Sequence, residues 1–260
     1  MAYTSGVNYI PPTELTEGKV LDINLPSNLN MIKRHYETFD HKFFEQVEEP
    51  PCLGDFYLYN LDEINVNVLR LLIKSQNSCS LHLPKELEKF RYLICKCAEE
   101  YSKMFMDFKE TFVYITIRTC FENYYRNSSD WHIDGFQGTR IARHKPEVNL
   151  IWANSYGTEF AMRKFQVQDF DYTKYNINTH FNKIAELDKN LNIFRCEPNQ
   201  IYMMDPYMIH RAPFCDFSTK RVFVRINFSP VEIPDWTNTV NPMLPMHYEK
   251  RTDIRDLLID

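Results

Sequence analysis

Two short segments of this 260-residue chain carry residues of the types that serve as ligands for divalent metals. His132 and Asp134 lie two residues apart in SDWHIDGFQG, and His210 lies in MDPYMIHRAP. On an extended segment, residues two apart point to the same side, so both can reach one ion. With His210 they form a set of two imidazoles and one carboxylate, which leaves Fe(II) three adjacent open positions for a bidentate ligand and dioxygen. A four-ligand structural zinc site has no such vacancy.

Two arginines follow His210 on a predicted strand, RVFVRINF. Arg221 lies eleven residues after His210 and Arg225 lies four residues further, so both point to one face of the strand. Arginines on an otherwise apolar strand need anionic partners if they are buried. A dicarboxylate co-substrate would fit their planar guanidinium groups, and protein carboxylates are the alternative partners.

Further residues surround this set: Trp131 and Gly135 flank the H-x-D, Gly157 precedes Thr158, Asp205 precedes His210, and Arg211-Ala212-Pro213 follows it. With them, the sequence resembles the iron(II)/2-oxoglutarate-dependent oxygenase superfamily. Residues 205–228 look most like its taurine-dioxygenase-like and phytanoyl-hydroxylase-like branches. The resemblance covers about residues 110–230. It implies an α+β fold, mainly β, with a cupin-like double-stranded β-helix (jelly-roll) core and N-terminal helices packed on one face.

The resemblance also implies roles for single residues. His132, Asp134 and His210 would be the catalytic iron ligands, with Fe(II), 2-oxoglutarate and O2 as the cofactor and co-substrates. Arg221 would bind the distal carboxylate of 2-oxoglutarate, and Thr158 matches a threonine that binds a co-substrate carboxylate. Arg225 would lie near the metal-chelating end or the substrate. The two arginine roles can also be exchanged.

The implied reaction is hydroxylation of an unactivated C–H bond, with succinate and CO2 as co-products. Related halogenases have a small residue where this chain has Asp134, so a carboxylate there favours hydroxylation. Desaturation and cyclisation remain open. The first 110 residues match no subfamily, so the resemblance does not name the substrate. We expect a small polar molecule, such as an amino acid or a specialised metabolite.

The elements that must position these residues follow from hydrophobic periodicity. Apolar residues at helical spacing predict helices over 62–76 and 84–107, the second opened by Pro84. Alternating or continuous apolar runs predict strands over 112–121, 147–154, 158–165, 192–196, 199–204 and 221–228. A weaker helical pattern covers 179–188, and 249–260 is typical of a terminal helix. Short strands after a helical segment favour a β-sandwich or barrel with helices on one face.

We expect one oxygenase domain over residues 1–260. Its parts are a mainly helical 1–110, a jelly-roll core over 111–230 and a C-terminal extension over 231–260. The polar insertion 166–190 is either a lid over the site or a solvated connector.

Composition excludes several classes of protein. The net charge is -5, which disfavours nucleic-acid binding as the main role. No signal peptide or apolar run long enough for a membrane span is visible. The seven cysteines lack a C-x-x-C pair, which is typical of reduced thiols in a cytoplasmic protein. The sequence does not indicate an oligomeric state.

Five other residues are candidate substrate contacts, although each also fits a structural role: Tyr114, Arg118, Trp131, Asn149 and Trp152. Competing functions also remain open. Hydroxylation of a protein or peptide side chain is the second hypothesis, and demethylation of a nucleic acid is the third. A non-catalytic jelly-roll metal-binding module is an alternative of another class. A cupin-like metalloenzyme without 2-oxoglutarate would have no use for Arg221 and Arg225.

Overall fold

The structure is a computed structural model. It describes residues 14–23, 25, 40–105, 108–120, 130–134, 147–171, 174–213, 220–233 and 237–244. The predicted terminal helix over 249–260 and Gly135 lie outside these ranges. Among the helices within them, none has the length and apolar character needed to cross a lipid bilayer.

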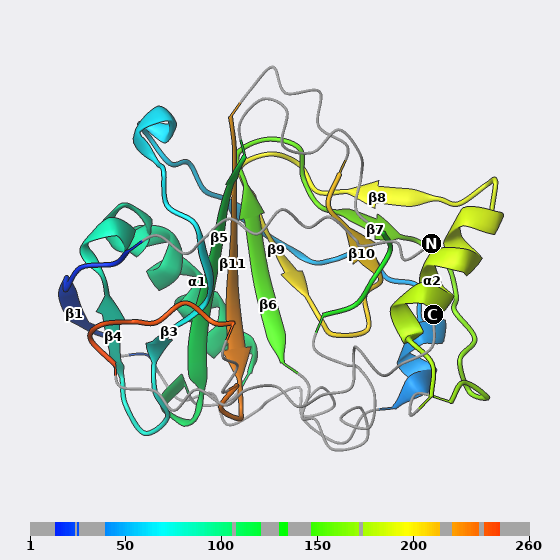
Figure 1. Cartoon of the computed structure of the whole chain (residues 1–260), viewed down its shortest axis with the longest axis horizontal. Helices are drawn as coiled ribbons and strands as arrows, with labels where there is room; N and C mark the ends of the chain where they lie inside the picture. The colour runs from blue at the N-terminus through cyan, green and yellow to red at the C-terminus, as the bar shows by residue number, and fades with distance from the viewer. Residues whose placement is uncertain are drawn as a thin grey trace.

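Two antiparallel sheets form the centre of the molecule (Figure 1). The large sheet has the order β2 (Cys52–Asp55), β9 (Gln200–Met204), β6 (Val148–Ala153), β11 (Arg221–Ser229), β5 (Phe112–Cys120) and β3 (Val68–Lys74). The small sheet has the order β10 (His210–Arg211), β7 (Glu159–Ala161) and β8 (Ile193–Arg195). A backbone bridge between His132 and His210 extends the small sheet by one more segment.

The chain passes back and forth between these two sheets, except that β7 and β8 follow each other within the small sheet. It runs from β5 to the bridged His132 segment, then to β6, β7 and β8, and then to β9, β10 and β11. Antiparallel strands wound alternately into two facing sheets form a jelly roll. The expected fold class is therefore confirmed.

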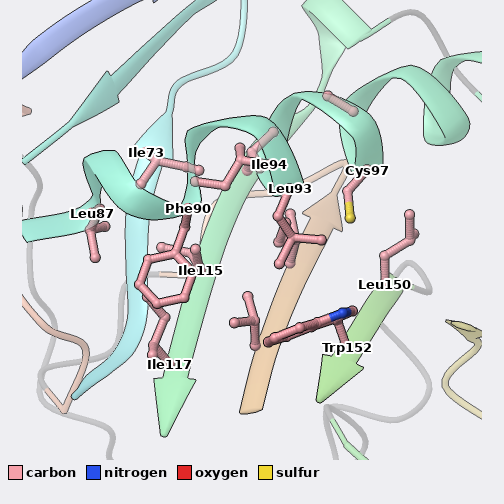
Figure 2. Close-up of a cluster of buried hydrophobic side chains, with 14 of the residues drawn as sticks. Ile73, Leu87, Phe90, Leu93, Ile94, Cys97, Ile115, Ile117, Leu150 and Trp152 are labelled. Atoms are coloured by element: carbon pink, nitrogen blue, oxygen red, sulfur yellow. The ribbon is translucent and has the colours of Figure 1, made fainter. Parts of the chain in front are cut away.

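The outer face of the large sheet is covered by helix α1 (Arg91–Met104), which continues the 3-10 helix η4 (Lys85–Phe90). Figure 2 shows Leu93, Ile94 and Cys97 of this helix packed over apolar side chains of the sheet, with Ile117 and Trp152 among them. The predicted helix over 84–107 is confirmed in its main part. Because strand side chains alternate, residues of β11 that do not enter this core face the small sheet.

That alternation decides where the arginines lie. The apolar residues Val222, Val224, Ile226 and Phe228 belong to the core beneath α1. Arg221, Phe223, Arg225 and Asn227 therefore line the inner face of the jelly roll. A second apolar cluster occupies the space between the sheets, with Ile151, Phe160 and Tyr202 among its members.

The predicted helix over 62–76 is wrong. Its centre forms β3, which pairs with β5, and only Leu61–Glu63 form a short 3-10 helix, η3. The run Val-Leu-Arg-Leu-Leu-Ile is buried almost throughout, so its apolar residues fit helical and strand spacing equally well. The expectation of a mainly helical 1–110 is also wrong. Its described part holds four strands, with β1 (Lys19–Asp22) and β4 (Ser80–Leu83) forming a separate pair.

The other predicted elements have counterparts close to their expected positions. Strands β5, β6, β7, β8, β9 and β11 lie within or across the predicted strand ranges, although β7 and β8 span three residues each. The weaker helical pattern corresponds to α2 (Ile177–Leu187). Two further 3-10 helices are η2 (His41–Glu45) and η5 (Phe108–Glu110). Helix α2 lies on the side of the small sheet, at the opposite end of the molecule from β1 and β4 (Figure 1).

Candidate metal centre

His132 and His210 are held opposite each other by two backbone hydrogen bonds. The N–H of each residue donates to the carbonyl oxygen of the other at 2.9 Å. This pairing brings the two imidazole rings to a centroid separation of 4.6 Å. The small sheet thus brings together His132 and His210, which are 78 residues apart in the sequence.

Asp134 completes the cluster. One ligand atom from each of His132, Asp134 and His210 lies within 4.8 Å of the other two. The Nε2 atom of His210 is 3.4 Å from Oδ2 of Asp134. The structure therefore brings the three predicted ligands together, as the i, i+2 spacing in the H-x-D requires.

Both histidines present the same nitrogen to the cluster. Nδ1 of His132 lies 2.7 Å from the carbonyl oxygen of Asp130, and Nδ1 of His210 lies 2.9 Å from that of Met208. A carbonyl oxygen only accepts, so Nδ1 carries the hydrogen and the lone pair on Nε2 is left for a metal. A second hydrogen bond of this kind is the usual support for a metal-binding imidazole.

Charge also favours metal binding. Burial, together with the neighbouring His210, lowers the pKa of His132 to about 4, so its imidazole is neutral at physiological pH. Burial alone would raise the pKa of Asp134, but the Arg225 guanidinium and His210 hold it well below its ordinary value. Nη1 of Arg225 donates directly to Oδ2 of Asp134. The cluster thus offers two imidazoles and one carboxylate, the donor set that suits Fe(II) with open positions.

Helix α2 supports the backbone on either side of His132. The N–H of Trp131 donates to Oδ1 of Asn182 at 3.1 Å, and the N–H of Ile133 donates to Oδ1 of Asn178 at 2.9 Å. Residues four apart lie on one face of a helix, which lets both amides reach the same segment. Trp131 and Ile133 also pack into an apolar cluster with α2, so their side chains point away from the metal ligands. The insertion 166–190 thus contributes a supporting helix.

The strand that carries His210 is fixed from two sides. Oδ1 of Asp205 accepts the N–H groups of Tyr207 and Met208, which shapes the turn before His210. Nε of Arg211 donates to the buried Glu159 at 2.7 Å, and its guanidinium lies 4.2 Å from the ring centre of Trp131.

Arg221 lies at the other end of the inner face from Asn227. Its Nε donates to the carbonyl oxygen of Tyr156 at 2.8 Å, next to Gly157 and Thr158. A Cβ on Gly157 would lie 1.9 Å from the carbonyl oxygen of Cys196, so only glycine permits this close approach. The structure thus places Arg221 beside the Gly-Thr segment and Arg225 beside Asp134, two separate positions along one strand face.

The other candidate substrate residues divide between the two faces of the large sheet. Trp152 belongs to the core beneath α1 and its Nε1 donates to the carbonyl of Phe56, so it lies away from the metal cluster. Tyr114 faces inward, but its hydroxyl accepts the N–H of Ile233. Asn149 is buried on the inner face, and Arg118 is half-buried opposite Phe223 on β11. Trp131 contacts Arg211 and α2, as described above.

Sequence reasoning missed several residues of the site. Asn182 lies within the expected helical segment 179–188 and Asn178 lies one residue before it, but a pair of amides four residues apart has no distinctive signal until its partner is known. Glu147 and Asn227 also lie on the inner face near Asn149. Alternation along the predicted strand 221–228 places Asn227 on the face of Arg225, although it gives Asn227 no role, and alternation along 147–154 could have placed Glu147 beside Asn149.

Fold and site together define this chain as a jelly-roll protein with a candidate mononuclear metal centre. No family model and no curated protein matches the sequence. Among solved structures, it is similar to EvdO2 from Micromonospora carbonacea var. aurantiaca complexed with 2-oxoglutarate, at 13% identity and a TM-score of 0.39 over 78% of this chain and 82% of that one. It is also similar to AviO1 from Streptomyces viridochromogenes Tue57, at 9% identity and a TM-score of 0.38 over 79% and 100% of the two chains. An oxidoreductase of the 2OG-Fe(II) oxygenase family from Burkholderia pseudomallei shares 11% identity, with a TM-score of 0.36 over 78% and 80%.

Proposed function

We propose that this chain is an Fe(II)- and 2-oxoglutarate-dependent dioxygenase that hydroxylates a C–H bond of a small polar molecule. The observation that carries the proposal is the convergence of His132, Asp134 and His210, whose ligand atoms lie within 4.8 Å of one another and whose Nδ1 hydrogen bonds leave both Nε2 lone pairs for a metal. Three protein ligands of these types are the facial set of non-haem Fe(II) oxygenases.

The residues present fit such an ion. His132 is neutral and Asp134 is ionised, so neither must lose a proton before binding a cation. A bound Fe(II) would supply the activation of dioxygen, which no side chain can provide. The protein supplies the ligand geometry, and the Nδ1 hydrogen bonds keep each imidazole oriented.

The proposal assigns the distal carboxylate of 2-oxoglutarate to Arg221 and Thr158. Arg221 is buried, and its Nε already binds the carbonyl of Tyr156, so its Nη atoms are oriented by a fixed anchor. Thr158 is buried beside Cys196 and contributes to a small cavity that Phe223 and Ile151 also line. Arg225, bound to Asp134, lies at the metal end. Co-substrate turnover would yield succinate and CO2.

The test is anaerobic loading of the purified chain with Fe(II) followed by 2-oxoglutarate. We expect about one Fe(II) per chain and a visible charge-transfer band when 2-oxoglutarate chelates the ion. His132→Ala should abolish both signals. His82→Ala is the matched control, because His82 lies on β4 in the separate strand pair. Absence of Fe(II) binding by the unaltered chain would refute the proposal, and Fe(II) binding without the band would favour a cupin-like enzyme that does not use 2-oxoglutarate.

A further inference from the structure

A buried polar cluster lies on the inner face of the large sheet, formed by Glu147, Asn149 and Asn227. Their exposed fractions are 1%, 1% and 3%. Asn149 on β6 and Asn227 on β11 are directly opposite each other in the sheet register. Arg225, which contacts Asp134, lies two residues before Asn227 on β11. Residues two apart on a strand are neighbours on one face, so the cluster lies next to Arg225.

The hydrogen bonds fix how both amides point. The Glu147 carboxylate only accepts, so Asn227 must turn Nδ2 toward it. The same Nδ2 donates to Oδ1 of Asn149 at 2.9 Å. Among the residues that the structure describes, Oδ1 of Asn227 and Nδ2 of Asn149 consequently have no partner, and neither does Nε of Arg225. A buried polar atom without a partner loses the hydrogen bonds it would make in water, so three such atoms together indicate a ligand that satisfies them.

Glu147 differs from the other buried carboxylate near the site. Glu159 is equally buried and has two arginine partners, Arg195 and Arg211. Within the described ranges, Glu147 receives one hydrogen bond, from the Asn227 amide, and forms no ion pair. A buried carboxylate is stable only with strong compensation, and a cationic ligand group would provide it.

We propose that this cluster is the substrate subsite and that the substrate is a zwitterion, of which a free α-amino acid is the simplest form. The ammonium group binds the Glu147 carboxylate and Oδ1 of Asn227. The carboxylate group binds Nδ2 of Asn149 and Nε of Arg225. The inference rests on the proposed function and narrows its substrate class, because donors and acceptors are both left unpaired beside the metal cluster.

The experiment is calorimetric titration of the anaerobic Fe(II)·2-oxoglutarate protein with the proteinogenic L-amino acids. Each amino acid that binds is compared with its carboxylic acid lacking the amine and with its amine lacking the carboxylate. Succinate formation in air is measured in parallel. We expect at least one amino acid to bind and stimulate turnover, and both truncated analogues to bind roughly tenfold or more weakly.

Two variants locate the contact. Glu147→Gln keeps the shape and the acceptor for Asn227 but removes the charge, so it should weaken amino-acid binding about tenfold and leave the Fe(II)·2-oxoglutarate band unchanged. Glu232→Gln, an exposed neighbour, should change neither. An intact band with no amino acid bound would overturn the inference and leave the proposed function standing. If the unaltered chain bound the amine-free analogue as tightly as the amino acid, the inference would also be overturned. Loss of the band in the unaltered chain is a failure of the proposed function instead.

Discussion

The side-chain oxygen of Asn178 accepts the backbone N–H of Ile133 at 2.9 Å, between the two candidate metal ligands of the H-x-D. Asn182, one helical turn later, makes the same contact with Trp131. Helix α2 thus fixes the backbone conformation that points His132 and Asp134 to one side.

Asn178→Ala should therefore weaken metal binding about tenfold, the size expected when support behind a ligand is lost. It should also lower the free energy of unfolding by about 1–3 kcal/mol, because a buried N–H loses its acceptor. Titration with Mn(II) and chemical denaturation measure the two effects. Asn178→Asp retains the acceptor oxygen and should restore metal binding, whereas the exposed Lys183→Ala on α2 should change neither quantity. Unchanged metal affinity in Asn178→Ala would show that α2 does not position the ligands.

Arg221 and Arg225 should have separable effects. Arg221→Ala is expected to raise the Kd of 2-oxoglutarate roughly 100-fold, because a buried carboxylate loses its charged partner. Its Mn(II) affinity without co-substrate should stay unchanged, since Nε of Arg221 binds the carbonyl of Tyr156, which is none of the three candidate ligands. A weakened charge-transfer titration with normal metal content is the expected result. If Arg221→Ala weakened Mn(II) binding as much as 2-oxoglutarate binding, Arg221 would have to act at the metal instead.

Arg225→Gln should tighten divalent metal binding. Gln can still donate to Asp134, so the carboxylate keeps a partner, while the positive charge that opposes a cation is removed. Coulomb repulsion over a few ångströms is worth several kcal/mol at protein dielectric values, which exceeds the cost of an exchanged hydrogen bond. We expect Mn(II) affinity to rise about tenfold in calorimetry. A fall in affinity would mean that orientation of Asp134 outweighs charge.

Glu159→Gln should destabilise the small sheet. Glu159 on β7 binds Arg211 on β10 and Arg195 on β8, so one carboxylate links all three strands. Breaking a buried pair costs about 3 kcal/mol here, the lower end of the usual range because Arg195 remains exposed. The exposed Glu63–Lys89 pair is the comparison, and Glu63→Gln should change stability by less than about 0.5 kcal/mol. Urea denaturation of both variants measures the two losses of stability, and an equal loss in the two variants would contradict the prediction.

Thiol labelling should separate two exposed cysteines from two buried ones. Burial raises the pKa of Cys97 and of Cys196, so these thiols stay protonated where an ordinary cysteine ionises. Cys52 and Cys79 are exposed. Because iodoacetamide must reach the sulfur and reacts with the thiolate, it should label the exposed Cys52 and Cys79 and leave the buried pair unlabelled until urea is added. Peptide mass spectrometry reads out each site, and early labelling of Cys196 would contradict its burial.

The sequence was sufficient to predict the elements whose faces differ strongly in polarity. Apolar and polar residues alternate along β5 and β11, and the apolar residues of α1 form one stripe at helical spacing. Each element could therefore be assigned from the spacing of its apolar residues. Strand β3 is buried almost throughout, and its near-continuous apolar run carries no period that separates strand from helix. Its pairing with β5 depends on long-range contacts, which local propensity does not encode.

The candidate site was predictable to the same extent. Metal ligands are restricted to a few residue types, so His132, Asp134 and His210 stood out by chemistry and spacing. Asn178 and Glu147 did not, because amides and carboxylates are common on any surface. Only the folded arrangement shows that Asn178 meets the Ile133 N–H and that Glu147 is buried beside Asn227.

The amide contacts from α2 also determine how the small sheet ends. The outward N–H groups of residues 131 and 133 would otherwise form an open β-edge, which can recruit an extended segment from another molecule. Asn178 and Asn182 occupy those donors, and the helix behind them covers the row. On this side of the barrel, strand addition by a second chain is blocked by the same two side chains that hold the metal loop in place.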